Sequence, residues 1–274
     1  MSANPKTHYA ALRSSVYYAA GGNRQLFAYA YAPHGTEETN IEFAEHVVEI
    51  RDVRHAPHAL RLEVEGASVL SHRSAVSSFY DEDELRRVGY SEAAELVRSA
   101  TGAAEVVVFD HNIRGRKGPA KALAATDVKN PVFHIHTDFS DTSALSRAAA
   151  VLGRPLLPGQ RMAAINVWRP IAEPLRDSPL AICDASSVEM RDLLAADLIY
   201  PNRTGQIYYV AHNPAHRWYY ASDMRKDEVW LFKNFDTVTD GRARFAPHTA
   251  FVDPTHPVVA PRESVEFRTF AFFN

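Results

Sequence analysis

The chain has 274 residues, of which 46% are hydrophobic and 23% charged, and its formal net charge is −3. This composition is ordinary for a globular protein, and the missing basic excess disfavours a nucleic-acid-binding protein. The single cysteine, Cys183, excludes an internal disulfide framework and a cysteine-based metal site. One cysteine also favours a reducing, cytoplasmic compartment. The first residues contain no apolar signal core. The sequence also has no run of about 18 apolar residues that would predict a membrane helix.

The N-terminal part reads as strands followed by one long helix. Alternating apolar and aromatic residues predict strands at 15–20 and 25–33, whereas 42–54 fits either a strand or a helix. Residues 61–72 read as an alternating strand with a glycine turn. Residues 81–101 predict the longest helix. Its apolar face would comprise Leu85, Val88, Ala93, Leu96 and Val97.

From residue 104 the sequence predicts a succession of short strands. They are expected at 104–115, 130–140, 161–171, 179–187, 206–214, 216–223, 228–237, 243–253 and 262–273. A helix is expected at 142–153, capped by Thr142 or Ser143, and a short helix near 188–197. Such regular strand spacing favours a sandwich, jelly roll or barrel over a parallel α/β sheet. We therefore expect one domain over 1–274, in which 1–104 is an N-terminal extension and 105–274 the β core.

The segment His134-Ile135-His136-Thr137-Asp138 is the most informative one. Residues two apart on a strand share a face, so His136 and Asp138 project together, with His134 behind them. A histidine and a carboxylate on one face, joined by a distant histidine, form a facial triad that suits iron(II). The third ligand is left open among four later histidines: His212, His216, His248 and His256. In the alternative, His134 and His136 are hydrogen-bonded surface or cleft histidines without a metal.

The last predicted strand carries polar groups on one face. These are Arg262, Ser264, Glu266 and Arg268. A cosubstrate carboxylate deep in a barrel requires a fixed cation, and arginine binds carboxylates with a two-pronged fork. In the alternative without a cosubstrate site, Arg262 is an exposed charge at the end of the strand, and Glu266 and Arg268 lie on a solvated face.

These motifs together resemble a known family. The blocks FDHNIR, HIHTDFS, INVWRPI, PLAICDASS, HRWYYASDM, DEVWLFKNFD, PHTAFVDP and PRESVEFR are similar to iron(II)/2-oxoglutarate-dependent dioxygenases. The similarity is closest to the family of the hydroxylase component in cephamycin 7α-methoxylation, with AsaB-type and gibberellin-desaturase-like fungal proteins. It covers about residues 105–274. It implies a mainly β, double-stranded β-helix (jelly-roll or cupin-like) fold with flanking helices.

The resemblance also implies a set of site residues, with Fe(II), 2-oxoglutarate and O2 as cofactor and cosubstrates. His136 and Asp138 match the paired ligands and His248 the distal histidine. Arg262, assisted by Ser264, would bind the far carboxylate of 2-oxoglutarate, with Arg268 as the rival. Asn166 and Trp168 would line the cosubstrate side. Because the spacing from His248 to Arg262 is longer than is common in the superfamily, His216 remains an alternative ligand.

The predicted activity is oxidation of a small-molecule specialised metabolite by hydroxylation, desaturation, cyclisation or peroxidation. The alternatives are a cupin-like metalloenzyme that does not use 2-oxoglutarate and a non-catalytic ligand-binding barrel. A third is a component that works only with a partner enzyme, and a homodimer also remains open. We expect no nucleic-acid or membrane partner.

Overall fold

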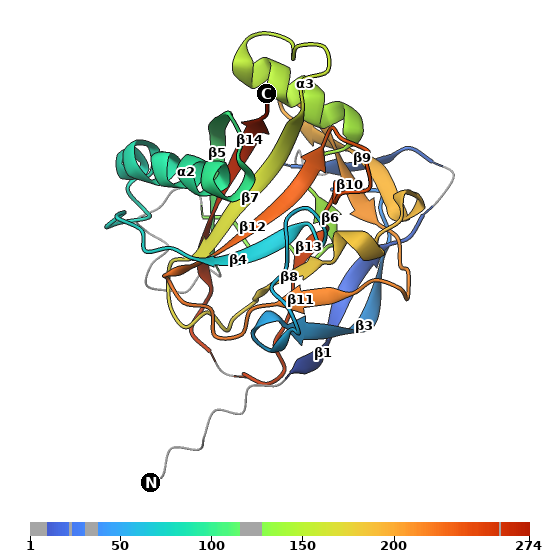
Figure 1. The fold of residues 1–274 in the computed structure, drawn as a ribbon. Helices are drawn as coiled ribbons and strands as arrows, with labels where there is room; N and C mark the ends of the chain where they lie inside the picture. Colours follow the sequence, from blue (N-terminus) through green and yellow to red (C-terminus); the bar gives the residue numbers. More distant parts are fainter. Residues whose placement is uncertain (1–9, 22–23, 31–37, 116–127, 258) are drawn as a thin grey trace.

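The protein is seen here in a computed structural model that describes residues 10–21, 24–30, 38–115, 128–257 and 259–274. A nine-stranded sheet and a five-stranded sheet curl around a shared core (Figure 1). The nine-stranded sheet runs in the order β1 (Ala11–Ala19), β3 (Phe43–Asp52), β11 (Trp218–Tyr220), β8 (Leu180–Cys183), β13 (His248–Ala250), β6 (His136–Thr137), β10 (Arg203–Val210), β9 (Leu193–Tyr200) and β2 (Leu26–Tyr29). The five-stranded sheet runs β4 (Ala67–Ser71), β12 (Glu228–Asp236), β7 (Met162–Pro170), β14 (Glu263–Phe272) and β5 (Glu105–Gly115). The predicted mainly β fold is confirmed.

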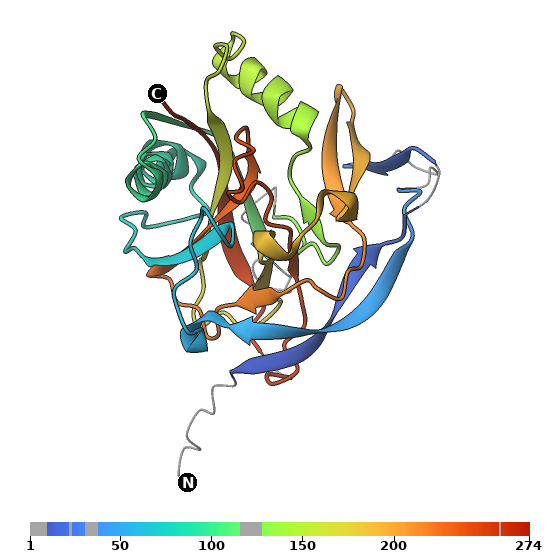
Figure 2. The ribbon, with the colours of Figure 1, turned by 45° about the vertical axis from the view of Figure 1, so that its right-hand side comes forward.

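Strand β7 lies at the centre of the five-stranded sheet, and all nine of its residues are buried. One face packs into the shared core and the other packs toward helix α2 (Tyr90–Thr101). The N-terminal strands β1 and β3 continue the nine-stranded sheet, in which β11 pairs parallel with β3 (Figure 2). The expected strand at 25–33 is β2, and its last predicted residues lie outside the described ones.

The predicted helix over 81–101 is present, with an unusual turn inside it. It consists of α1 (Glu82–Glu84), a π-helical turn (Leu85–Gly89) and α2, which ends at Gly102 in the left-handed conformation. A Cβ at Gly89 would lie 2.9 Å from the Phe267 ring, so glycine permits the close approach to β14. The helix thus covers the outer face of the five-stranded sheet.

Two helix predictions need correction. Helix α3 (Asp141–Leu152) is capped by Ser140 and not by Thr142 or Ser143, because the Ser140 hydroxyl accepts from the Ser143 N–H. Near 188–197 only a 3-10 turn (Met190–Asp192) forms before strand β9 begins. Pairing of β9 with β10 over eight residues outweighs the local helix propensity there.

Three strand expectations are also refined. Residues 42–54, which fitted either structure, form strand β3. Of the strand expected at 61–72, only the part that is β4 forms. Before it the chain makes a turn, because three backbone N–H groups donate to the Arg61 carbonyl. The expected strand at 130–140 shortens to β6, which has two residues. No helix in the described part of the chain is long and apolar enough to cross a bilayer.

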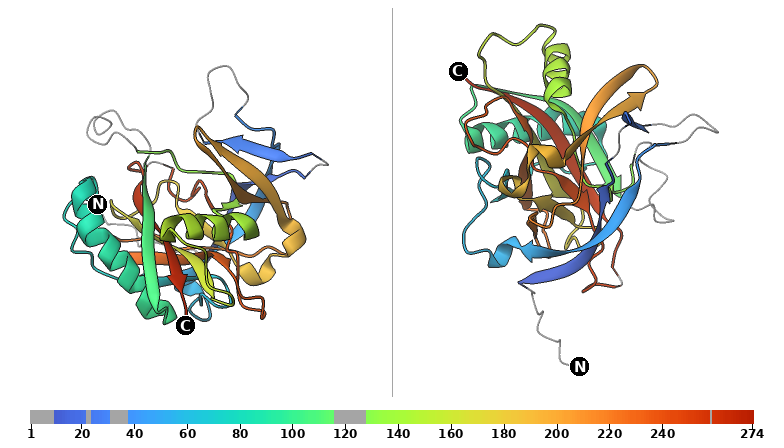
Figure 3. Two further views of the ribbon diagram at one scale, coloured as in Figure 1. Left: turned by 90° about the horizontal axis from the view of Figure 1, so that it is seen from above. Right: turned by 90° about the vertical axis from the view of Figure 1, so that its right-hand side faces the viewer.

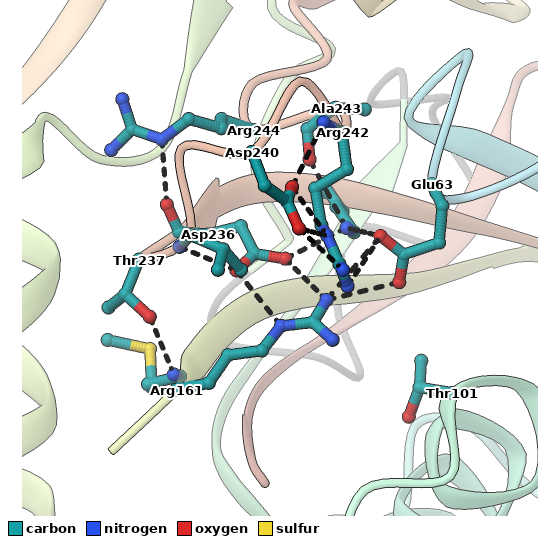
Figure 4. Close-up of polar contacts among 12 residues, drawn as sticks. Glu63, Thr101, Arg161, Asp236, Thr237, Asp240, Arg242, Ala243 and Arg244 are labelled. Carbon is teal, nitrogen blue, oxygen red and sulfur yellow. Dashed lines mark hydrogen bonds and ion pairs between the residues drawn. The ribbon is translucent and has the colours of Figure 1, made fainter. Parts of the chain in front are cut away.

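A group of charges around the buried Lys233 and Asp236 holds the loop that leads into β13. We call it the Lys233 cluster; it comprises Glu63, Arg161, Lys233, Asp236 and Arg242. Figure 4 labels Glu63, Arg161, Asp236 and Arg242. The fully buried Lys233 Nζ donates to Glu63 at 2.7 Å, to Asp236 at 2.9 Å and to the Ala243 carbonyl at 3.2 Å. The Ala246 N–H also donates to the Lys233 carbonyl at 2.9 Å. These bonds fix the chain just before His248.

Candidate metal centre

Three predicted side chains meet between the two sheets. His136, Asp138 and His248 each present one possible ligand atom, and these atoms lie within 4.8 Å of one another. Strands β6 and β13 pair antiparallel with His136 directly opposite His248, so the two imidazoles are cross-strand neighbours. Their ring centroids are 4.5 Å apart, and His136 Nε2 lies 3.9 Å from Asp138 Oδ1. Sheet register therefore joins residues that are more than a hundred positions apart.

Both imidazoles have the same hydrogen-bonding arrangement. His136 Nδ1 lies 2.8 Å from the His134 carbonyl and His248 Nδ1 lies 3.4 Å from the Ala246 carbonyl. A carbonyl only accepts, so in this arrangement each Nδ1 carries the proton and each Nε2 has its lone pair free. A backbone acceptor behind a ligating histidine is the usual way in which proteins set its tautomer for a metal.

Asp138 is held from the opposite sheet. Its N–H donates to Asn234 Oδ1 on β12 at 2.8 Å. Asn166 Nδ2 on β7 and Arg268 Nε on β14 both donate to its Oδ2, at 2.7 and 3.1 Å. Both of these short bonds are made to Oδ2, whereas Oδ1 accepts only a longer bond, from Arg268 Nη2 at 3.5 Å, and lies nearer His136.

The surroundings also set the protonation states. Burial lowers the pKa of His136 to about 3, and the neighbouring His248 acts in the same direction. Burial also lowers the pKa of His248 to about 4. Burial alone would raise the pKa of Asp138, but Arg268 and the two histidines outweigh it and hold the pKa below its usual range. Near neutral pH the imidazoles are neutral and the carboxylate is ionised, as metal binding requires.

The two arginines of the last strand have different surroundings. Arg268 forms ion pairs with three carboxylates, Asp138 at 3.1 Å, Asp110 at 3.3 Å and Glu266 at 3.3 Å. Arg262 is buried, yet no carboxylate among the described residues forms an ion pair with its guanidinium. Burial, with a smaller effect of Arg114, lowers its pKa to about 9, so it remains charged at neutral pH.

Arg262 lies at a small cavity beside the three-residue group. Its Nε donates to Ser264 Oγ at 3.0 Å, its Nη1 donates to the Ser178 carbonyl at 2.7 Å, and its guanidinium lies 5.0 Å from the centre of the Trp168 ring. This cavity has a volume of about 20 Å³, and both His136 and His248 line it. The volume is less than a small diacid requires, so a bound diacid would displace side chains here.

A larger cavity of about 430 Å³ opens on the other side of His136 and Asp138. Helix α3, strand β5 and the β9–β10 hairpin contribute to its walls. Figure 3 shows how these elements are arranged in the fold. Its apolar lining includes Phe109, Val132, Leu198, Ile207 and Tyr209. The cavity is large enough for a small organic molecule.

The remaining predicted histidines lie elsewhere. The expectation that His134 shares the face of His136 is wrong, because the segment is not a regular strand and His134 is exposed and stacks on Phe43. His216 bonds to Tyr18 and Asp192. His212 stacks on His46 at 3.8 Å, and His256 Nδ1 lies 3.1 Å from Asp253 Oδ2.

Sequence reasoning missed three residues of the site. Asn234 anchors Asp138, and its own Nδ2 is buried without a partner in the described part of the chain. Arg114 at the end of β5 lines both cavities. Glu266, for which a solvated face was possible, is buried between Arg268 and the small cavity. Burial, followed by the charge of Asp138, raises the pKa of Glu266. For Asn234 and Arg114 the only sequence signal was their place inside the quoted blocks, whereas Glu266 was also marked by sharing a strand face with Arg262, Ser264 and Arg268.

The chain matches known proteins along most of its length. The family model "Oxidoreductase/YMDC permease-like domain" matches residues 16–272. The hydroxylase/desaturase efuI of Hormonema carpetanum is 33% identical over 269 residues, with 88% of each chain covered. The alpha-ketoglutarate-dependent dioxygenase phiK of Fungal sp. (strain ATCC 74256) is 31% identical over 234 residues, which is 82% of this chain and 83% of that protein.

A solved structure has the same fold. The iron and alpha-ketoglutarate-dependent endoperoxidase NvfI superposes with a TM-score of 0.84 at 23% identity, covering 97% of this chain and 99% of that one. This likeness concerns the fold alone. The chain belongs to the iron(II)/2-oxoglutarate-dependent dioxygenase and hydroxylase/desaturase family. The family resemblance predicted from the sequence motifs is thereby confirmed.

Proposed function

We propose that His136, Asp138 and His248 bind the iron(II) of this oxygenase and that the larger cavity binds the small molecule to be oxidised. The observation that carries the proposal is the convergence of two free Nε2 atoms and one carboxylate oxygen within 4.8 Å. Two imidazoles and a carboxylate are the donor set of iron(II) oxygenases and leave coordination positions open. The residues therefore fit the metal that the family uses.

The protein side of the site would keep this donor set in place. Asn166 and Arg268 hold Oδ2 of Asp138 by the shorter bonds, and Oδ1, which accepts only a 3.5 Å bond from Arg268, would bind the metal. The carbonyls behind His136 and His248 hold the rings in position. Bound iron with 2-oxoglutarate and O2 would supply the oxidising chemistry, while the protein binds, orients and excludes side reactions.

Arg262 is the proposed partner of the far carboxylate of 2-oxoglutarate. Its guanidinium is buried beside the small cavity and forms no ion pair with a carboxylate of the described residues, whereas Arg268 is already matched by carboxylates. A buried carboxylate requires a charged and geometrically matched donor, which the guanidinium provides. Ser264 holds the Nε of Arg262, and the Trp168 ring packs against its plane.

The reaction proposed is oxidation of a specialised metabolite, as the hydroxylase/desaturase names of the curated relatives suggest. The substrate and the outcome, whether hydroxylation, desaturation, cyclisation or peroxidation, follow from how the larger cavity presents a C–H bond to the metal. We assign no partner enzyme; an active purified chain would exclude that requirement.

The direct test is iron-dependent binding and turnover of 2-oxoglutarate. The purified chain should bind one iron(II), should bind 2-oxoglutarate measurably by calorimetry only when the metal is present, and should form succinate in air. Iron binding without any affinity for 2-oxoglutarate would favour a cupin-like metalloenzyme instead. Absence of both would favour a ligand-binding barrel.

A further inference from the structure

The lining of the larger cavity carries an excess of positive charge. Its cations are Arg114, Lys129, Arg147, Arg203 and Arg268, whereas its carboxylates are Asp110 and Asp138. Both carboxylates already pair with Arg268. Among the described residues, the lining therefore has more cations than carboxylates to pair with them.

Three of these cations form what we call the cationic wall: Lys129, Arg147 and Arg203. Lys129 Nζ donates to the neutral Asn112 at 2.8 Å. Arg147 on α3 lies over the Phe109 ring at 5.4 Å, and Arg203 at the start of β10 lies over the Tyr200 ring at 3.8 Å. Among the described residues none of the three forms an ion pair with a carboxylate.

Stacking leaves the two arginines able to bind a ligand. A ring held against the face of a guanidinium orients the group while its N–H donors at the edge stay available. The lining also has apolar side chains, among them Phe109, Leu198 and Ile207. A cavity lined both by apolar side chains and by donors of positive charge complements an apolar molecule that carries an anionic group.

The cosubstrate does not account for this charge. Arg262, the proposed partner of 2-oxoglutarate, lines the small cavity and not the larger one. The two charges of iron(II) and the two of 2-oxoglutarate also cancel, so loading the site would leave the cationic wall as it is.

We infer that the substrate of this oxygenase is an apolar small molecule that bears a carboxylate, bound by Arg147 and Arg203 with Lys129 nearby. This inference rests on the proposed function for its place in catalysis. Recognition by the cationic wall concerns binding alone and is measurable without turnover.

The test compares two probes of nearly equal shape, naphthylacetic acid and its neutral amide. Titration calorimetry is performed on the anaerobic chain loaded with iron(II) and 2-oxoglutarate, and again on the unloaded chain. The acid should bind at least about tenfold more tightly than the amide, the effect expected for a charge-assisted hydrogen bond. The difference should shrink at high salt, because the cavity is open to solvent.

Variants connect the preference to the residues. Combining Arg147→Gln with Arg203→Gln should abolish the preference for the acid. Arg154→Gln, which alters an exposed arginine just after α3 that does not line the cavity, should keep it. Equal affinity of the two probes, no binding of the acid, or a preference that survives the paired change would overturn the inference.

The outcomes separate this inference from the proposed function. A preference for the acid in a chain that binds no iron would contradict the oxygenase site and support the cationic wall. An iron-loaded chain that turns over 2-oxoglutarate but binds the acid and the amide equally well would support the oxygenase site and contradict the cationic wall.

Discussion

The Lys233 cluster and the cationic wall use the same residue types in opposite ways. In the cluster, the buried Lys233 and the partly buried Arg161 are matched by Glu63 and Asp236. In the wall, the cations face an open cavity and have aromatic or amide neighbours instead. Burying a charge costs several kcal/mol unless it is paired, whereas a charge at an open cavity stays hydrated. Charge in the first region therefore supports the fold, and charge in the second remains available to a ligand.

The largest effect is expected in the metal centre, where binding and fold can be separated. Asp138→Ala and His248→Ala should each remove iron binding and all turnover, because each deletes one of three proposed ligands. Iron per chain and succinate formation are the measurements. The control is His216→Gln, which should retain iron; loss of iron in this variant with retention in His248→Ala would exchange their roles.

How far the sequence predicted this centre depends on the distance between the residues. His136 and Asp138 could be paired because a two-residue spacing is a local property of extended backbone. His248 came from the family resemblance, because its position opposite His136 is set by strand register. The outward position of His134 could not be foreseen, since the strand that was expected to carry it has only two residues.

The fold shows the same division. The mainly β class and the helix over 81–101 followed from periodicity. The strand at β9 was missed because its conformation depends on pairing with β10. The triple pairing of Arg268 and the anchoring of Asp138 by Asn234 bring together separate strands, which no local pattern encodes.

The comparison of the two charged regions is tested next by removing a cation from each. Lys233→Met should lower the free energy of unfolding by about 1–3 kcal/mol, because buried Asp236 loses the hydrogen bond from Lys233 and keeps only Arg161 as its cationic partner. Arg147→Gln in the cationic wall should change it by less than about 0.5 kcal/mol. Urea unfolding measures both. Equal losses in the two variants would mean that the wall also supports the fold.

Smaller effects, on ligand binding, are expected from changing Arg268 in β14 or Arg262 just before it. Arg262→Gln should weaken 2-oxoglutarate binding at least about tenfold, since a charge-assisted pair is worth about 1.5–3 kcal/mol, and should leave iron binding nearly intact. Arg268→Gln should instead weaken iron binding, because it frees Asp138 to move. Calorimetry with each ligand separates the two roles; weaker 2-oxoglutarate binding in Arg268→Gln alone would transfer the cosubstrate to that residue.

A small effect is also expected at the rim of the Lys233 cluster. Arg242 has 31% of its side chain exposed and lies 3.6 Å from Glu63. Exposed pairs contribute about 0–1 kcal/mol, so Arg242→Gln should lower stability by less than about 1 kcal/mol. Urea unfolding of Arg242→Gln and Lys233→Met measures the two losses of stability. Equal losses would mean that Arg242 contributes as much to the cluster as Lys233 does.

The central claim is that three named side chains hold the iron. It is tested most directly by diffraction at the iron absorption edge from crystals grown anaerobically with iron(II) and 2-oxoglutarate. We predict one anomalous peak per chain, bonded to Nε2 of His136, Nε2 of His248 and one oxygen of Asp138. A peak bonded to His216, or a fully loaded chain with no peak between these three residues, would contradict the account.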